Sequence, residues 1–152
     1  MVYSKFMYIE SIPKNSCNYI NDAWDIKCSI NEEQELLKQK QDSFDEIYRQ
    51  SKVYIAKDYN GVLIGYACLT DNNYLSFLAV DLEHQRTGVG RSLIKEIKKD
   101  YKYFYCHARL SNNTAYEFYI DLEFNVEKIV ESYYKNSEDA YVLEYIDEDI
   151  YY

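Results

Sequence analysis

The chain has 152 residues, the length of one domain, because single hydrophobic cores typically serve about 100 to 150 residues. With 47% apolar and 28% charged residues it can bury roughly 70% of its unfolded surface, which excludes wholesale disorder. No apolar stretch approaches the ~18 residues of a membrane span, and the opening MVYSKFMYIE lacks the apolar region of a signal peptide. Four cysteines without CxxC spacing predict free thiols in a reducing cytosol.

The net charge of -9 argues against nucleic acid as the main partner, since phosphate binding needs clustered Lys and Arg. The charge is unevenly spread, however. Residues 131–152 carry seven acids and one Lys, whereas residues 85–109 carry seven bases and two acids. One basic stretch in an acidic protein indicates a local site for an anionic ligand, with a solvated helix face as the alternative.

The first half of the chain predicts strands and helices in alternation. Residues 6–12 read as a strand that stops at Pro13, and residues 31–50 as a helix, with the segment around Trp24 also partly helical. The expected buried face of that helix carries Leu37, Phe44, Ile47 and Tyr48. Residues 52–58 and 62–70 are β-rich and are joined at Asn60-Gly61, a strong hairpin signal.

A third strand is predicted at residues 74–81, after which the hydrophobic period changes. Residues 88–100 predict an amphipathic helix, and residues 103–110 predict the next strand. The apolar face of that helix consists of Val89, Leu93, Ile94, Ile97 and Tyr101. A strand-helix-strand unit of this length normally closes as a right-handed parallel crossover.

The last part predicts a helix at residues 113–122, followed by an antiparallel pair at residues 125–134 and 140–147. The helix has Ala115, Phe118, Tyr119 and Leu122 on one face. The whole is therefore α+β, with one mixed sheet and helices packed on it.

Two of the four glycines, Gly88 and Gly90, lie in a turn between the third strand and its helix. Such a turn can direct several backbone N–H groups at one point, and Gly permits close approach of a ligand. The helix N-terminus adds partial positive charge, and Arg86 and Arg91 would reinforce it, which suits a pyrophosphate. Tight packing of the helix on the sheet is the alternative explanation.

Residues 78–94, LAVDLEHQRTGVGRSLI, resemble the acetyl-CoA signature of the GNAT superfamily of N-acetyltransferases, in which (Q/R)xxGx(G/A) follows a strand. The resemblance implies that loop amides hold the pyrophosphate and that main chain at Leu78 and Val80 pairs with the pantetheine arm. An amide at the strand end would stabilise charge on the acetyl carbonyl, as an oxyanion hole does. The implied loop residues are Gln85, Arg86, Thr87, Gly88, Val89, Gly90 and Arg91.

A second block, residues 107–124 (HARLSNNTAYEFYIDLEF), is similar to the later motif of the same superfamily. The resemblance implies that Asn112 binds near the pantetheine and that Tyr119 protonates the leaving thiolate. Packing of helix on sheet is the alternative role for Tyr119. Where the family usually has Gly, this chain has Glu123, which must adopt a left-handed backbone or end the helix differently.

Within the superfamily, the chain is most similar to protein N-terminal acetyltransferases of the alanine/methionine type. The likeness rests on His107, on Tyr133-Tyr134 and on the segment EDAY at residues 138–141. It implies that His107 and Tyr74 deprotonate the amine and that Tyr133 and Tyr134 bind the acceptor. A His of ordinary pKa, ~6.5, suits proton transfer near neutrality. The alternatives are a structural His107 and ordinary strand tyrosines.

The resemblance implies a GNAT fold over residues 1–152 as a single domain. Its mixed, mostly antiparallel sheet should have about six to seven strands with about four helices, and an acetyl-CoA slot between splayed central strands. The likeness is weakest over the first fifty residues, where this superfamily builds one wall of the acceptor slot.

The predicted function is a cytosolic N-acetyltransferase that uses acetyl-CoA as cosubstrate, needs no metal, and transfers acetyl directly to a primary amine. A peptide or protein α-amine is the preferred acceptor. A polyamine, amino sugar or amino acid is the first alternative, and a non-catalytic acyl-CoA-binding module is the second. A covalent route through Cys106 is disfavoured, because strand alternation directs Cys106 and His107 to opposite faces. The oligomeric state is left open.

Overall fold

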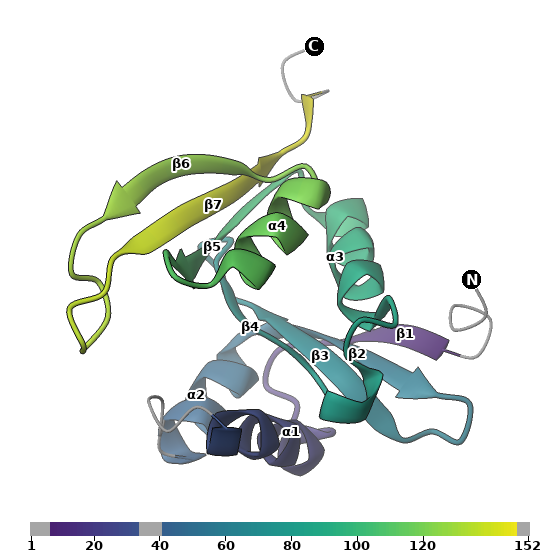
Figure 1. The fold of residues 1–152 in the computed structure, drawn as a ribbon. Helices are drawn as coiled ribbons and strands as arrows, with labels where there is room; N and C mark the ends of the chain where they lie inside the picture. Colours follow the sequence, from purple (N-terminus) through teal and green to yellow (C-terminus); the bar gives the residue numbers. More distant parts are fainter. Residues whose placement is uncertain (1–6, 34–40, 149–152) are drawn as a thin grey trace. The chain divides into compact units, whose positions relative to one another are not determined.

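The computed structural model describes residues 7–33 and 41–148 (Figure 1). Contacts within the chain group it into two compact units, the first ending at Ile97 and the second beginning at Lys98. Among the described helices, none is both long and apolar enough to cross a membrane.

The first unit is built on a four-stranded antiparallel sheet in the order β1-β2-β3-β4. Its strands are β1 (Met7–Ile12), β2 (Lys52–Asp58), β3 (Leu63–Leu69) and β4 (Leu75–Val80). The predicted hairpin between β2 and β3 is confirmed. Gly61 has φ +83°, and the Asp58 carboxylate accepts the N–H groups of Asn60 and Val62 at 2.9 and 3.0 Å. This Asx-type bonding fixes the turn locally.

Two helices, α1 (Ile20–Glu33) and α2 (Gln41–Gln50), pack on one face of this sheet (Figure 1). The centre of the contact is the fully buried ring of Phe44, whose centroid lies 5.1 to 6.1 Å from those of Trp24, Tyr48, Tyr66 and Phe77. The helix predicted at residues 31–50 is thus observed as α2 in its second part, while residues 31–33 end α1. Leu37 lies outside the described residues.

The opposite face of the sheet is covered by α3 (Val89–Asp100) at Gly65. A Cβ on Gly65 would lie 2.9 Å from Val89 Cγ1 and 3.2 Å from the Ala79 carbonyl oxygen, so only Gly lets the helix approach this closely. Four residues of the predicted apolar face of α3 are confirmed as buried: Val89, Leu93, Ile94 and Ile97. The fifth, Tyr101, lies just beyond the end of α3 and is half-buried. Because Val89 is the first residue of α3, this contact also fixes where the helix starts.

The second unit contains a three-stranded antiparallel sheet in the order β5-β7-β6. Its strands are β5 (Tyr103–Arg109), β6 (Asn125–Val130) and β7 (Ala140–Ile146), and α4 (Asn113–Asp121) lies along one face (Figure 1). Burial alternates along β5, and the buried residues Phe104, Cys106 and Ala108 lie on the face that α4 covers. Phe104 packs edge-on against Phe124 at 5.2 Å, which also contacts Tyr119 at 5.1 Å.

The seven strands and four α-helices of the described residues confirm the predicted α+β class, but two details of the prediction were wrong. The described strands form two sheets rather than one mixed sheet, and every pairing between them is antiparallel. The strand-helix-strand unit forms no parallel ladder between β4 and β5 among the described residues: β4 pairs only with β3, and β5 pairs only with β7.

The strand predicted at residues 125–134 ends at Val130. The chain leaves the sheet at Ser132, which has φ 51° and donates its N–H to the Asp139 carboxylate at 2.9 Å. Tyr133 and Tyr134 therefore belong to the β6–β7 loop and are not strand residues.

Gly65→Ala should lower the free energy of unfolding by about 1 to 3 kcal/mol, because the added methyl group overpacks the contact between β3 and α3. Urea denaturation followed by circular dichroism measures the change in midpoint. Lys95→Ala, at an exposed position of α3, is the control and should stay near wild type. An unchanged midpoint in Gly65→Ala would show that α3 can shift without cost.

Candidate functional site

The loop between the 3-10 helix η2 (Leu82–His84) and α3 is left-handed at two positions, Arg86 (φ 63°) and Gly88 (φ 93°). A Cβ on Gly88 would meet nothing within 4 Å, so the space beside this residue is open. The N–H of Ser92 donates to the Gly88 carbonyl at 3.0 Å, and the N–H groups of the three residues before it have no acceptor one turn back. The residues concerned are Val89, Gly90 and Arg91.

These free amides lie at the positive end of the α3 dipole, beside the open space at Gly88, with Arg86 and Arg91 in the same loop. This is the donor set that a pyrophosphate requires. The loop predicted as a phosphate site from sequence therefore has both the backbone conformation and the space for one.

Two side chains of this loop serve to hold its shape. Gln85 Nε2 donates to the Val80 carbonyl oxygen at 3.2 Å, and the Thr87 hydroxyl donates to the His84 carbonyl. His84 in turn lies 3.2 Å from the Asp81 carboxylate. The structure thus gives the side chains of Gln85 and Thr87 partners within the protein.

The strand that leads into the loop offers a free edge. The N–H of Asp81 donates to the Ile64 carbonyl at 2.8 Å, so the backbone groups that face β3 belong to odd-numbered residues of β4. Those of Leu78 and Val80 point away from β3, because the direction alternates along an antiparallel strand. In the sheet of the first unit, β4 is the outermost described strand. Leu78 and Val80 can therefore pair with an extended ligand.

In the second unit, the imidazole of His107 contacts a group of aromatic rings. Its imidazole lies almost parallel to the ring of Tyr133, with the centroids 4.2 Å apart and an interplanar angle of 10°. Tyr133 meets Tyr134 edge-on at 5.0 Å. The structure thus brings together three of the residues singled out from sequence, although they come from β5 and from the β6–β7 loop.

Two residues that the sequence analysis did not assign complete this stack. The Arg109 guanidinium lies 3.9 Å from the ring centroid of Tyr134 and forms an ion pair with Glu138 at 2.9 Å. Glu138 also accepts the N–H of Ser111 at 3.1 Å and the Ser111 hydroxyl. Opposite charges 29 positions apart in sequence were the only available signal, and nothing in the spacing paired them.

The surroundings of His107 favour its neutral form. Burial lowers its pKa below the ordinary value, and the nearby positive charge of Lys128 lowers it further. Lys128 and His107 both lie opposite Val142 in the register, one on each side of β7. A neutral imidazole can accept a proton at neutral pH, as a general base must.

Cys106 and Tyr119 lie on the other face of β5, as strand alternation predicted for Cys106. Cys106 is 2% exposed, and burial raises its pKa to about 12, partly offset by a hydrogen bond with Tyr119. A thiol of this kind is not a nucleophile near neutral pH. Tyr119 is itself buried. Because it lies on the face of β5 opposite to His107, the structure does not place the two side chains beside each other.

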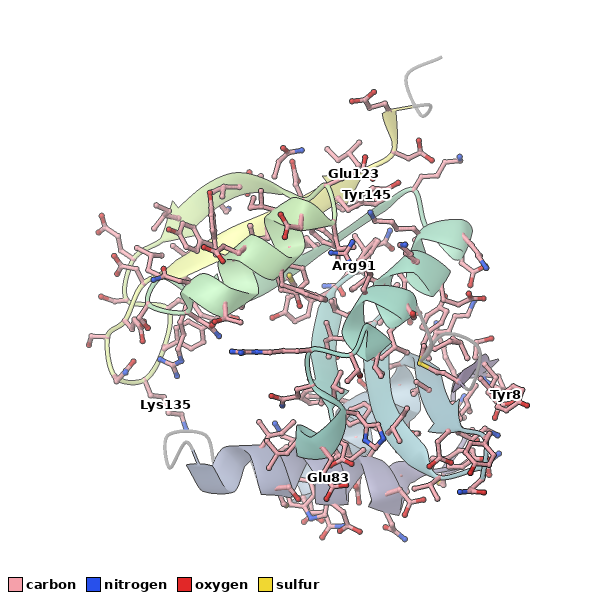
Figure 2. The ribbon with its side chains drawn as sticks, turned by 45° about the vertical axis from the view of Figure 1, so that its right-hand side comes forward. Tyr8, Glu83, Arg91, Glu123, Lys135 and Tyr145 are labelled. Atoms are coloured by element: carbon pink, nitrogen blue, oxygen red, sulfur yellow. The ribbon has the colours of Figure 1, made fainter. Side chains whose placement is uncertain are left out.

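The ends of α4 account for two further residues. Asn112 is its N-cap, and its side-chain oxygen accepts the N–H of Ala115 at 3.0 Å. Glu123 adopts the left-handed backbone expected of the family's Gly position, with φ 70°. Lys98 lies 3.7 Å from its carboxylate and 4.4 Å from the ring of Tyr145, and Figure 2 shows Glu123 and Tyr145 at the same end of this unit.

Tyr74, the second candidate for the base, directly precedes β4 in the first unit, where its carbonyl accepts the N–H of Thr70 at 2.9 Å. Its joint action with His107 of the second unit stays a prediction. Within the described ranges 7–33 and 41–148, no group of three or more His, Cys, Asp or Glu side chains could hold a metal ion.

Comparison with known proteins decides the family. A family profile described as an acetyltransferase (GNAT) domain matches residues 25–136, most of the chain. The chain belongs to the GNAT acetyltransferase family. The prediction of a GNAT fold and of an acetyltransferase domain is therefore confirmed.

The relatives include enzymes of N-terminal acetylation. The catalytic subunit NAA10 of the N-terminal acetyltransferase A complex of Arabidopsis thaliana is 28% identical over 103 residues, which are 59% of this chain and 54% of that protein. The match thus spans about half the length of this curated relative.

Two solved structures share the fold. The ribosomal-protein-S18-alanine N-acetyltransferase from Escherichia coli has a TM-score of 0.74 at 22% identity, covering 91% of this chain and 92% of that one. A GNAT acetyltransferase from Elizabethkingia anophelis with acetyl-CoA bound has a TM-score of 0.70 at 18% identity, covering 92% and 97%. At these identities the likeness concerns the fold.

Gly88→Asp should abolish the thermal stabilisation that coenzyme A gives the wild type, because it adds a negative side chain to the open space beside the free amides. A ligand that binds only the native state adds about 2.7 kcal/mol at a hundredfold excess over Kd. Thermal denaturation with and without coenzyme A measures the loss.

Gly61→Asp is the matched control for this variant. Gly61 also has positive φ and open space around it, but it lies in the β2–β3 turn. It should carry a similar backbone cost and keep the response to coenzyme A. A full response in Gly88→Asp would remove the pyrophosphate site from this loop.

Proposed function

We propose that this protein transfers the acetyl group of acetyl-CoA to the α-amine of a peptide or protein. The observation that supports this most is the neutral, half-buried His107 stacked on Tyr133 at 4.2 Å, in a chain of the GNAT family. The alternative acceptors, a polyamine, amino sugar or amino acid, are outcomes of the tests below, as is binding of acyl-CoA without turnover.

Acetyl-CoA fits the residues of the first unit. The amides of residues 86–91 would hold its pyrophosphate, with the open space at Gly88 admitting it. The free backbone groups of Leu78 and Val80 would pair with the pantetheine arm, while Gln85 and Thr87 keep the loop in shape. Bound acetyl-CoA supplies the activated acyl group. Asn112 of the second unit is proposed to support the pantetheine in addition to capping α4.

The base is proposed to be His107, alone or with Tyr74. Its lowered pKa leaves the imidazole unprotonated at neutral pH and ready to accept a proton from the incoming ammonium group. Tyr119 is proposed as the acid that returns a proton to the thiolate. A covalent step on Cys106 does not enter the proposal, because that thiol is buried with a pKa of about 12.

The acceptor preference follows from amine chemistry. At pH 7.5 about a third of α-amines are neutral, whereas roughly one Lys side chain in a thousand is, so one weak base favours the α-amine. Tyr133, which is 44% exposed, and Tyr134 would hold the first peptide residues by ring contacts and main-chain hydrogen bonds. Free amines without a peptide backbone lack those contacts.

The two compact units are proposed to act as one catalytic domain, because the matched family profile runs across the boundary between Ile97 and Lys98. A cytosolic location is proposed from the composition and the four free cysteines.

His107→Gln should lower turnover on the true acceptor by roughly 10²- to 10⁴-fold while leaving the affinity for acetyl-CoA nearly intact. Steady-state kinetics and calorimetric titration with coenzyme A measure the two quantities. His84→Gln, in the other unit, is the control for loss of a histidine. A rate close to wild type in His107→Gln would transfer the role of base to Tyr74 or ordered water.

Tyr119→Phe should also slow turnover without loss of coenzyme A binding, since it removes a proton donor and keeps the ring. Because Tyr119 bonds Cys106, Cys106→Ala serves as a second control that removes the partner alone. Full activity in Tyr119→Phe would assign this residue to packing.

Short peptides with free N-termini should be acetylated at the α-amine in preference to internal Lys and to spermidine at equal concentration. Mass spectrometry of each product locates the acetyl group. If spermidine or another small amine reacts about tenfold faster, the small-molecule activity replaces the proposed one. If coenzyme A binds and no amine reacts, the protein is a binding module.

A further inference from the structure

We propose that Arg109 and Glu138 are positioning residues, which hold the β6–β7 loop so that Tyr133 stays stacked on His107. We call this ion pair the loop clamp. Its catalytic consequence rests on the proposed function, whereas its geometry does not. The sequence analysis assigned neither residue a role.

The contacts run without a break from the clamp to His107. The guanidinium of Arg109 covers the ring of Tyr134 at 3.9 Å, and Tyr134 meets Tyr133 edge-on at 5.0 Å. Tyr133 then stacks on His107 at 4.2 Å. Arg109 and His107 are two positions apart on β5, so both side chains leave the same face of the strand. Arg109 therefore contacts the β6–β7 loop from the same face of β5 that carries His107, the proposed base.

Glu138, which belongs to the β6–β7 loop, is the second member of the clamp. One carboxylate oxygen pairs with Arg109 at 2.9 Å, and the other accepts the N–H and the hydroxyl of Ser111. These bonds lower the pKa of Glu138, the Ser111 hydroxyl contributing most and Arg109 next, so the carboxylate stays ionised at neutral pH. The side chains of the pair are only 18% and 23% exposed, and this partial burial makes the charge-assisted bond between one Arg109 nitrogen and one Glu138 oxygen stronger than a surface ion pair.

The loop needs such a grip because its backbone is strained. Ser132 and Ser137 both have left-handed φ, 51° and 65°, a conformation that non-Gly residues adopt only when the surrounding structure holds them. Besides the clamp, Asp139 accepts the N–H of Ser132 at 2.9 Å. Without the clamp, we expect Tyr133 to leave His107 for part of the time.

Separation of the Tyr133 ring from His107 would change a measurable quantity, the pKa of His107. Burial is the largest cause of the lowered pKa of His107, so exposing the imidazole should raise its pKa toward the ordinary 6.5. The other titratable and charged groups on this face are Tyr103, Tyr105 and Arg109 on β5, Glu144 on β7, Glu127 and Lys128 on β6, and Tyr133, Tyr134 and Glu138 of the loop. Of these, Lys128 is the one that lowers the pKa of His107.

The test is the double variant Arg109→Met/Glu138→Gln, which removes the clamp without changing the net charge beside His107. The matched control is Lys102→Met/Asp147→Asn. It removes a different ion pair of the same unit, in which Lys102 Nζ lies 3.5 Å from the Asp147 carboxylate at the other end of β5. The chain has only two histidines, so the ring signals of His107 can be followed individually in an NMR titration.

In the clamp variant, we expect the pKa of His107 to rise. The KM for a short peptide with a free N-terminal Ala should rise about tenfold, and the acid limb of the pH profile should move to higher pH. The Kd for coenzyme A should stay within about twofold, because no clamp residue belongs to the phosphate loop. A merely structural loss would lower kcat at every pH and leave the pKa of His107 in place.

A folded clamp variant that matches the control in both the pKa of His107 and the KM for the peptide would overturn the proposal. If that variant does not fold, Arg109→Lys replaces it, since Lys keeps the charge but has no planar face for Tyr134. A shift of the same sign in Arg109→Lys supports the clamp, and wild-type values overturn it. The NMR titration needs no substrate, so it stands even if the wild type acetylates no α-amine.

Discussion

The alternation of side chains along β5 is the constraint on which the second unit depends. One face of the strand carries Cys106 into the core against Tyr119, and the other carries His107 and Arg109 toward the β6–β7 loop. A slip of one residue in the pairing of β5 with β7 would exchange the two faces. The register therefore decides that the imidazole is half-buried on the face of the β6–β7 loop, while the thiol is buried in the core.

In the first unit, the candidate site depends on backbone conformation more than on side chains. Left-handed backbone at Arg86 and Gly88 turns the chain into α3, and the close contact at Gly65 fixes where that helix begins. The result is a set of unbonded amides beside open space. Amides at a helix start can bind an anion without a cluster of basic side chains, so the proposed phosphate site is compatible with a net charge of -9.

Sequence patterns predicted the elements well wherever the signal was local. Hydrophobic periodicity located α3 and α4, and Asn60-Gly61 located the hairpin, because both signals lie within a few residues of the feature they specify. The patterns failed where partners are distant. The run of residues 125–134 reads as one long strand, yet Ser132 turns away because Asp139 accepts its N–H. The division into two sheets likewise depends on the pairing of β5 with β7.

The sequence by itself determined the family, and it singled out residues 85–91 as a candidate phosphate loop and His107 as a candidate base, because residue type and spacing within short motifs carry that information. Only the tertiary structure decided what surrounds His107. The ring of Tyr133 over His107 and the ion pair of Arg109 with Glu138 join residues 26 and 29 positions apart. Such contacts depend on how a loop returns to a sheet, and no local pattern encodes the direction of that return.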